Sequence, residues 1–471
     1  MSPPTILHLG TGSFHRAHQA WYLHRANEKL PEEKRWKLVC GNIRDDMNEV
    51  MELLKKQNCT YTLEIVDTDG KREYETIRSI DKIVDWSPGL RELISAGAAA
   101  DCRVLTFTVT EGGYFLDAED RLLLSHPDIA ADIDGFDFRS SVRTIYGTIA
   151  AILAKRAQRG AAGAITLMSC DNLRRNSERF QTGMREFLER RGQKALLAWF
   201  DQHATCPCAM VDRLTPRPSA EVAKRVKNAT GVDDPCSVMC ESFTLWYIED
   251  NFPSGRPDWD LGGAVFVRDA RPYLEAKIRV LNTSHTCAAW AGALAGFSFI
   301  HEALQDDAIR KMCYDYMTDD AIPCITPCPL DLEWFRDAFF SRFSHAHIPD
   351  RLERVTLNGY EKVQGFVSST VSDCISAGRK PAATGVLLAL FLRYLELWVE
   401  EKLPFEHREA DLDKASAREM VEEADQARAF AGQQKTWGEG ASHPMLEDAI
   451  REGLKTVDEW LASRIGANSN A

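Results

Sequence analysis

An excess of positive charge is absent from this sequence. Its 471 residues include 57 Lys and Arg against 70 Asp and Glu, which gives a formal net charge of −13 at pH 7. Nucleic acids and anionic membranes attract basic surfaces, because their phosphates carry negative charge. The charge balance therefore argues against a nucleic-acid partner and against a membrane partner.

A secretory signal is absent as well. The first residues, MSPPTILHLGTGSF, contain neither a basic start nor the apolar core of about 7–15 residues that such a signal needs. The thirteen cysteines are an odd number in a chain without a signal. A reduced, cytoplasmic setting therefore fits better than a disulfide framework.

A recognisable metal motif is also missing. The closest cysteine pairs do not form the familiar paired pattern of a zinc site; they are Cys206/Cys208, Cys236/Cys240 and Cys324/Cys328. We therefore expect buried, inert thiols and no bound metal.

The chain is too long for one hydrophobic core, since single cores stop growing near about 250–300 residues. Strand-like runs fade beyond about residue 271, and helical patterns follow, including residues 382–401. The charge-rich stretch 406–451 is typical of a solvated surface helix. We expect two domains, residues 1–270 and residues 271–471.

The first domain begins with a strand, a tight turn and a helix. Residues 5–9 are apolar, Gly10 and Gly12 follow, and residues 17–29 favour a helix that leads to a strand at 36–43. Further runs predict a hairpin through Asp69-Gly70 with a type I′ turn, and two buried strands; these runs are residues 61–66 and 72–77, then 103–109 and 163–168. The fold class is α/β, a Rossmann-type doubly wound sheet with an added hairpin, followed by a mainly α-helical domain.

The turn at Gly10 and Gly12 matches two of the three glycines of a dinucleotide fingerprint, and His15 stands where the third should be. A strand before it and a helix after it would present backbone N–H groups to a pyrophosphate. We expect cofactor contacts from the turn, namely Gly10, Gly12, Ser13, Phe14 and Arg16. A tight turn without a ligand is the alternative.

Polar residues at strand ends extend this predicted cofactor site. Asp45 and Asp46 follow the second strand, where a carboxylate accepts hydrogen bonds from ribose and repels a 2′-phosphate, which favours NAD over NADP. Thr110 and Glu111 end the strand at 103–109. For the two aspartates the alternative is simple capping of the next helix.

The pattern Lys277-x4-Asn282-x2-His285 carries the predicted chemistry. At about 100° per residue the three side chains lie within roughly 140° of one α-helical face, ahead of an apolar stretch. Burial lowers the pKa of a lysine toward neutrality, which a base for alcohol oxidation requires. A satisfied core histidine beside a lysine that reaches solvent is the alternative.

Five motifs together resemble the polyol-specific long-chain dehydrogenases, the mannitol dehydrogenase family. They begin at Gly10-Thr-Gly-Ser-Phe-His, Thr108-Val-Thr-Glu-Gly-Gly, Ser169-Cys-Asp-Asn, Val211-Asp-Arg-Leu-Thr-Pro and Lys277-x4-Asn282. The resemblance implies metal-independent, NAD-dependent oxidation of a sugar alcohol to a ketose. It implies Lys277 as base, Asn172 and Asn282 as hydrogen-bond donors to the alkoxide, and His285 as a residue that orients the substrate. Other substrate hydroxyls would bind Asp212, Arg342 and His345.

The resemblance is not complete. Leu274, with Glu275 beside it, stands where the family often has a glutamate, and Lys362-Val-Gln-Gly-Phe366 replaces a Lys-x-Pro-Lys-Phe stretch. Within the family, the opening motif favours oxidation of D-arabinitol to D-xylulose. Oxidation of D-mannitol to D-fructose and reduction of fructuronate or tagaturonate are the alternatives. A non-catalytic nicotinamide-binding regulator would not need Lys277. We expect a monomer or a small homo-oligomer.

Overall fold

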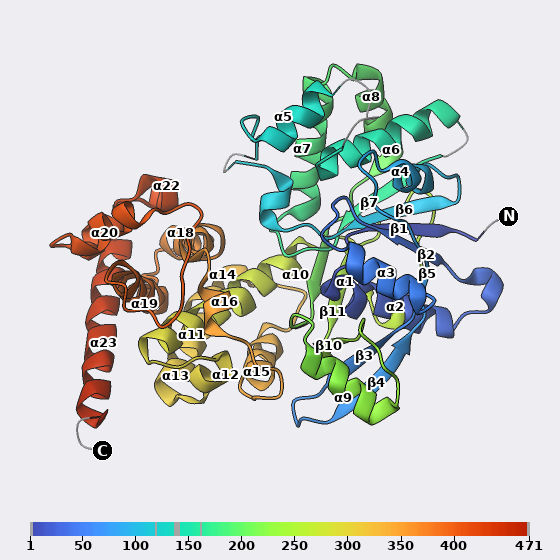
Figure 1. Ribbon diagram of the computed structural model, residues 1–471. Coiled ribbons are helices and arrows are strands. Elements are labelled where there is room, and N and C mark those ends of the chain that lie inside the picture. Colours follow the sequence, from blue (N-terminus) through green and yellow to red (C-terminus); the bar gives the residue numbers. More distant parts are fainter. Residues whose placement is uncertain (1–2, 118–119, 136–141, 161–162, 469–471) are drawn as a thin grey trace. The chain divides into compact units, whose positions relative to one another are not determined.

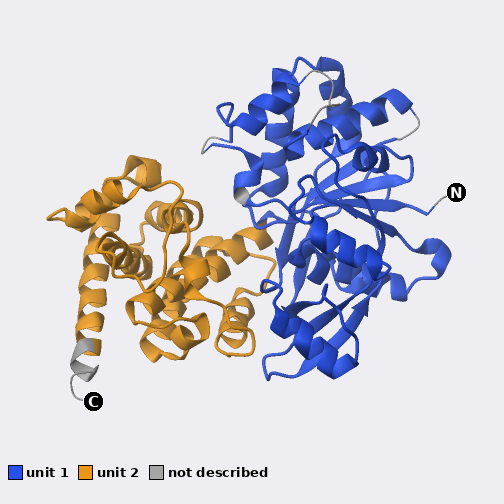
Figure 2. Ribbon diagram, viewed as in Figure 1, with its two compact units in different colours: residues 1–271 blue, residues 272–471 orange. Residues whose placement is uncertain are grey.

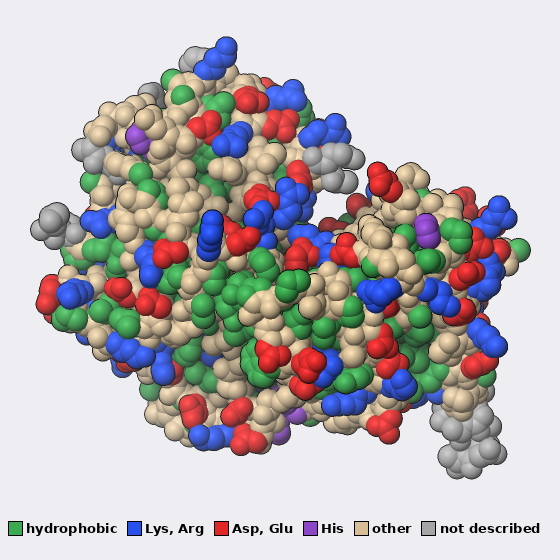
Figure 3. Space-filling view, turned by 180° about the vertical axis from the view of Figure 1, so that it is seen from behind, with side chains coloured by type: hydrophobic (Ala, Val, Ile, Leu, Met, Phe, Trp, Pro, Cys, Tyr) green, Lys and Arg blue, Asp and Glu red, His purple; other side chains and the backbone are tan. Residues whose placement is uncertain are grey.

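The computed structural model describes residues 3–117, 120–135, 142–160 and 163–468. The chain divides into two compact units, residues 1–271 and residues 272–471 (Figure 2). Acidic and basic side chains are interspersed over the face of the molecule seen in Figure 3.

The first unit is built on a six-stranded parallel sheet (Figure 1). The strand order is β5-β2-β1-β6-β7-β8; the strands are β1 (Thr5–Leu9), β2 (Lys37–Gly41), β5 (Ile80–Ile83), β6 (Cys102–Phe107), β7 (Ile165–Ser169) and β8 (Ala204–Thr205). Counted along the parallel sheet, this is the 3-2-1-4-5-6 order of a doubly wound nucleotide-binding fold. The predicted Rossmann-type fold is confirmed, and its switch point lies between β1 and β6.

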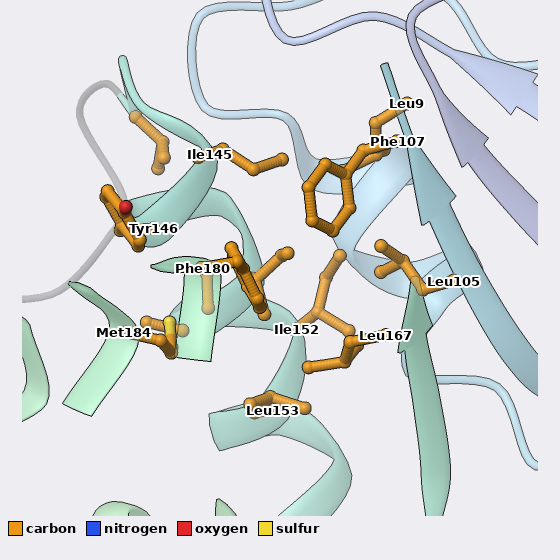
Figure 4. Packing of buried hydrophobic residues seen from close by; sticks show 14 of the residues in the cluster. Leu9, Leu105, Phe107, Ile145, Tyr146, Ile152, Leu153, Leu167, Phe180 and Met184 are labelled. Carbon is orange, nitrogen blue, oxygen red and sulfur yellow. The ribbon is translucent and has the colours of Figure 1, made fainter. Parts of the chain in front are cut away.

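Helices cover this sheet and close its core. Leu105, Phe107 and Leu167 from the strands face Ile152 and Phe180 from the helices (Figure 4). The rings of Phe107 and Phe180 are 4.8 Å apart. The helices of the unit are α1 (Ser13–Ala17), α2 (Gln19–Glu28), η1 (Glu32–Lys34), α3 (Asn48–Lys56), α4 (Arg91–Gly97), η2 (Glu111–Tyr114), α5 (Pro127–Asp134), α6 (Ile145–Arg159), α7 (Asn176–Arg190), α8 (Lys194–His203), α9 (Ala220–Thr230) and η3 (Trp259–Gly262).

The predicted hairpin is present as β3 (Tyr61–Val66) and β4 (Arg72–Ile77), but it does not extend the parallel sheet. It pairs with β10 (Val238–Glu241) in a separate three-stranded sheet. The prediction of a type I′ turn was wrong. The backbone N–H of Asp67 donates to the Lys71 carbonyl oxygen and closes a three-residue loop, in which only Gly70 has a positive φ, +85°. Such loops join a type I turn to a left-handed glycine.

A third small sheet contains β9 (Ala209–Asp212), β11 (Leu245–Glu249) and β12 (Val265–Val267). β9 runs antiparallel to β11, and Asp212, its last residue, pairs in register with Leu245. The sheet therefore fixes the backbone of one predicted substrate-binding residue.

The second unit contains helices and, in its described residues, no strand. Three of its segments, η4, η5 and η6, are π-helices. The helices from this region onward are α10 (Arg271–Ala276), η4 (Lys277–Asn282), α11 (Thr283–Leu294), α12 (Ile300–Gln305), α13 (Asp307–Asp315), η5 (Tyr316–Ala321), α14 (Ile322–Ile325), α15 (Leu332–Phe343), α16 (Leu352–Thr356), α17 (Gly359–Lys362), η6 (Val363–Val367), α18 (Ser368–Ser376), α19 (Ala382–Val399), α20 (Lys414–Glu422), α21 (Gln426–Ala431), α22 (Gln434–Trp437), η7 (Gly438–Gly440) and α23 (Pro444–Asn468).

The composition of residues 406–451 predicted a solvated surface helix, but the structure does not contain one continuous helix there. The carboxyl-terminal stretch forms several short helices and the long α23, which packs along α19. The two helices cross in backbone contact, since a Cβ added to Gly385 would lie 2.1 Å from the Ala449 carbonyl oxygen. Helix α19 is long and apolar enough to span a membrane, yet most of it is buried inside the unit, as in a core helix.

Candidate active site

The turn after β1 has the geometry that a pyrophosphate needs. Gly10 has φ +111°, and a Cβ there would lie 2.8 Å from the Thr108 hydroxyl oxygen. Gly12 is the N-cap of α1 and makes no side-chain cap, and a Cβ there would meet nothing within 4 Å. Open space therefore faces the first backbone N–H groups of a helix at the switch point, a fit for a dinucleotide phosphate.

The helix after the turn differs from the one predicted at 17–29. It is divided by His18, whose φ of −119° and ψ of −87° separate α1 from α2. The His18 ring packs between Phe14 and Trp246, with ring centroids 5.0 and 5.3 Å away. Aromatic packing thus stabilises a break that helix propensity alone did not reveal.

His15, at the position of the third glycine, supports the turn from inside. Its ring stacks on that of His8 at 3.5 Å, and both are buried. His8 Nε2 lies 2.9 Å from the carbonyl oxygen of Gly10. Burial lowers the pKa of His8 to about 3 and that of His15 as well, so the pair stays uncharged beneath the proposed phosphate position.

Arg16 does not point to the open side of the turn. Its side chain is buried, with the guanidinium 5.6 Å from the Tyr61 ring and donating to the Cys236 carbonyl oxygen. These contacts direct the guanidinium toward the core of the unit and away from the open side of Gly12. We therefore assign Arg16 to the packing between α1 and β10, whereas Ser13 and Phe14 remain partly exposed at the turn.

Asp45 and Asp46 are exposed in the loop after β2. Asn42 donates to the Asp46 carboxylate over 2.7 Å. The N-cap of α3 is Met47, and no side chain caps this helix. The capping alternative is thus not what the structure shows, and both carboxylates remain candidates for the ribose.

Polar groups also gather at the ends of β6 and β7. Thr110 is exposed ahead of η2, whereas the side chain of Glu111 lies outside the described part of the structure. Asp171 accepts hydrogen bonds of 2.5 Å from the hydroxyls of both Tyr114 and Ser169. Burial raises the pKa of Asp171 to about 6 in spite of these donors. This network fixes the backbone next to Asn172, whose side chain is exposed.

In the second unit, the predicted base lies in a π-helix. Lys277 and Asn282 are the first and last residues of η4, and Lys277 is 4% exposed. Thr283 explains the winding, because both its backbone N–H and its hydroxyl donate to the Ile278 carbonyl oxygen five residues earlier. Hydrogen bonds from i to i+5 bring residues five apart toward one face, and such segments are frequent at functional sites. Lys277 and Asn282 therefore point in more similar directions than α-helical spacing predicted.

His285, in α11, has a partner that the motif did not reveal. Its Nε2 lies 3.0 Å from Asp350 Oδ2, and Arg354 donates to both oxygens of the same carboxylate. Burial lowers the pKa of His285 against the effect of Asp350, while His285 and Arg354 lower that of Asp350. A carboxylate so placed orients the imidazole, and no sequence spacing pointed to it.

A buried arginine, Arg279, forms two ion pairs that hold the same π-helix in place. Arg279 in η4 donates to Asp373 over 2.5 Å and to Glu275 over 3.1 Å. Glu275 thus has a structural partner, and Leu274 beside it is 2% exposed. The paired arginine fixes the rotation of η4 and with it the direction of Lys277.

Three other elements of the second unit, α15, η5 and η6, pack against η4. Arg342 is buried in α15, and His345 lies just beyond that helix with its ring 5.2 Å from that of His347. Gln364 lies in η6, and its buried Nε2 has no hydrogen-bond partner among the described residues. The unit therefore brings Lys277, Asn282, Arg342 and one unsatisfied amide onto neighbouring elements.

One group of side chains has the composition of a metal site, namely His24, Glu28 and Glu75. However, the backbone N–H of Arg78 donates to His24 Nδ1, which leaves the proton on Nε2, the nitrogen that faces the carboxylates. A protonated Nε2 cannot bind a metal. We interpret the group as a neutral histidine whose Nε2–H faces two carboxylates.

Comparison with known proteins finds matches over nearly the whole chain. Residues 4–261 match the mannitol dehydrogenase Rossmann domain, and residues 269–458 match the mannitol dehydrogenase C-terminal domain. A D-arabinitol 4-dehydrogenase of Ralstonia nicotianae is 52% identical over 98% of both chains. One of Klebsiella pneumoniae is 43% identical over 96% of this chain and 98% of the relative. A Pseudomonas fluorescens mannitol 2-dehydrogenase, solved with NAD and D-mannitol, has a TM-score of 0.84 at 28% identity and covers 100% of this chain and 95% of its own.

Proposed function

Because the chain belongs to the mannitol dehydrogenase family, we propose that it oxidises D-arabinitol to D-xylulose with NAD and without a metal. The resemblance drawn from the motifs is thereby confirmed at the level of the family. The 52% identity to a D-arabinitol 4-dehydrogenase over nearly the full length supports the choice of substrate. The observation that carries the chemistry is the buried lysine of η4 with Asn282 five residues later.

In the proposed mechanism Lys277 accepts the proton of the reacting hydroxyl. Asn172 and Asn282 donate hydrogen bonds to the oxygen as it becomes an alkoxide, and His285, fixed by Asp350, orients the substrate. NAD, when bound at the Gly10 turn, supplies the carbon that accepts the hydride. Asp212, Arg342 and His345 read the remaining hydroxyls. Oriented donors that meet a developing charge are worth several kcal/mol in general.

The substrate is tested by comparing kcat/KM for D-arabinitol and D-mannitol. We expect D-arabinitol to be preferred by roughly 5- to 150-fold, because one unmatched hydroxyl or unpaired site group costs about 1–3 kcal/mol. The unsatisfied Nε2 of Gln364, in η6 next to η4, is the candidate hydrogen-bond donor to a distal hydroxyl of the substrate.

Gln364→Leu should reduce the preference for D-arabinitol over D-mannitol, whereas Gln433→Leu, a change elsewhere in the helical unit, should not. Faster turnover of D-mannitol would transfer the assignment to that polyol, and activity confined to uronates would assign an arginine to a carboxylate. Prolonged chelation should leave the rate unchanged.

The cofactor preference is tested at the loop after β2. Asp45→Ser combined with Asp46→Ser should shift the ratio of kcat/KM toward NADP, because an acceptor for ribose and the charge that repels a 2′-phosphate disappear together. Asp69→Ser, in the exposed hairpin loop, is the control. An unchanged NAD to NADP ratio in the double variant would remove both carboxylates from the cofactor site.

We infer a cytoplasmic setting from the thirteen cysteines, which are all free thiols in the structure. A reducing compartment keeps such thiols free. The expectation of a monomer or a small homo-oligomer stays a prediction, and light scattering of the purified protein tests it.

A further inference from the structure

Two cysteines that are fifty residues apart in the sequence meet in the helical unit. Cys324 belongs to α14 and Cys374 to α18, and their sulfur atoms are 3.5 Å apart (elements labelled in Figure 1). Cys374 is buried, whereas Cys324 is partly exposed. The sequence had predicted inert thiols, and only the fold brings this pair together.

A guanidinium lies against both sulfur atoms. Arg379 Nη2 donates to Cys324 Sγ over 3.1 Å and to Cys374 Sγ over 3.3 Å. Helix α18 ends in a Schellman motif, in which Gly378 has φ +67° and the backbone N–H of Arg379 donates to the Cys374 carbonyl oxygen. The motif returns the chain over the helix end and so positions the arginine.

The two thiols are not equivalent. The hydrogen bond from Cys374, helped by Arg379, lowers the pKa of Cys324, while the same hydrogen bond raises the pKa of Cys374. The greater exposure of Cys324 and its shorter hydrogen bond from Arg379 agree with this direction, which favours the thiolate on Cys324 and the proton on Cys374. A thiolate beside an arginine and open to solvent is the environment of a reactive cysteine.

We propose that Cys324 and Cys374 form a modification site for hydroperoxides, in which Cys324 reacts first and Cys374 closes a disulfide. The Cys324 thiolate attacks one peroxide oxygen, the O–O bond breaks, and a sulfenic acid and hydroxide result. The Cys374 sulfur then attacks Cys324, the S–O bond breaks, and the departing hydroxide takes the Cys374 proton. Two thiols and hydrogen peroxide thus give a disulfide and two waters, with the peroxide reduced.

The bond would act on the element that carries Lys277. A disulfide is about 2.0 Å long, so the sulfur atoms must approach by roughly 1.5 Å. Asp373, the residue before Cys374, is the partner of Arg279 in η4. Movement of α18 toward α14 therefore displaces the carboxylate that holds η4, and we expect a loss of turnover.

The test treats the full-length protein with hydrogen peroxide and maps its peptides without reduction. We expect a Cys324–Cys374 cross-link, a fall in kcat that parallels it, and recovery of both after treatment with dithiothreitol. Cys374→Ser should stop at a sulfenic acid on Cys324 that dimedone traps. Arg379→Gln should slow the reaction about tenfold or more, since a charge-assisted hydrogen bond to the thiolate is lost.

Cys328→Ser is the matched control, because Cys328 is another half-buried thiol of the same unit, with its sulfur 3.7 Å from the Pro272 carbonyl oxygen. It should react like the wild type. The proposal is overturned if other cysteines are oxidised while Cys324 stays reduced, or if Cys324→Ser consumes peroxide at the wild-type rate. Complete formation of the Cys324–Cys374 disulfide with an unchanged kcat would refute the proposed effect of this bond on η4 and Lys277. The peptide map does not depend on the proposed substrate, so it separates this inference from the proposed function.

Discussion

Replacement of Lys277 by alanine should lower kcat for polyol oxidation by about 10²- to 10⁴-fold, as expected for a lost general base. The side chain is 4% exposed at the start of η4, and alanine offers no basic group at that position. The reaction then lacks an acceptor for the hydroxyl proton. Single-turnover kinetics with D-arabinitol measure the loss.

Binding of NAD should persist in the same variant, because the Gly10 turn belongs to the other unit. Fluorescence titration of NADH checks this. Lys311→Ala removes an exposed lysine of the helical unit and serves as the control, since Lys311 pairs only with Asp315 on the surface of α13 in the described structure. Near-normal turnover in a folded Lys277→Ala protein would end the proposal for this base.

Replacement of Gly385 by valine should destabilise the helical unit by more than about 3 kcal/mol, beyond the usual cost of overpacking. Here the added Cβ would meet the Ala449 carbonyl oxygen at 2.1 Å, and a Cβ on Gly453 would meet the Gly385 carbonyl oxygen at 2.2 Å. Backbone cannot move aside as a flexible side chain can, so α19 and α23 must separate. Thermal unfolding followed by circular dichroism measures the effect.

Gly365→Ala is the matched control, because Gly365 is also helical and a Cβ there would meet nothing within 4 Å. It should be neutral or stabilising, since alanine favours helices over glycine by up to about 1 kcal/mol. Equal melting temperatures for Gly385→Val and the wild type would mean that the two helices do not depend on this crossing.

The sequence predicted those helices and strands that short stretches of neighbouring residues determine. Residues 5–9 with Gly10 and Gly12 indicated β1 and its turn, and two strand-like runs joined through Asp69-Gly70 indicated β3 and β4. The loop type was wrong, because Asp69-Gly70 fits a two-residue turn and a three-residue loop alike. The break at His18 depends on Trp246, a residue that is distant in the chain.

The same distinction applies to the candidate site. The glycines and Lys277 stand in motifs with short, recognisable spacing, so the sequence alone could propose them as candidates. Asp350 and Asp373 reach His285 and Arg279 across 65 and 94 positions, and only tertiary packing brings such partners together. Arg16 shows the opposite case, since it lies inside the motif yet is turned into the core.

The π-helical winding of η4 also bears on how related sequences should be aligned. A helix that adds one residue to a turn arises naturally from a single-residue insertion. Loss of one residue between Ile278 and Asn282 would restore α-helical winding, and because the wide turn would lose its extra residue, Lys277 would keep nearly the same direction relative to α11. A related protein that is one residue shorter within Lys277-x4-Asn282 would therefore still present its lysine on the same side of the helix, and an alignment with a one-residue gap there pairs equivalent lysines.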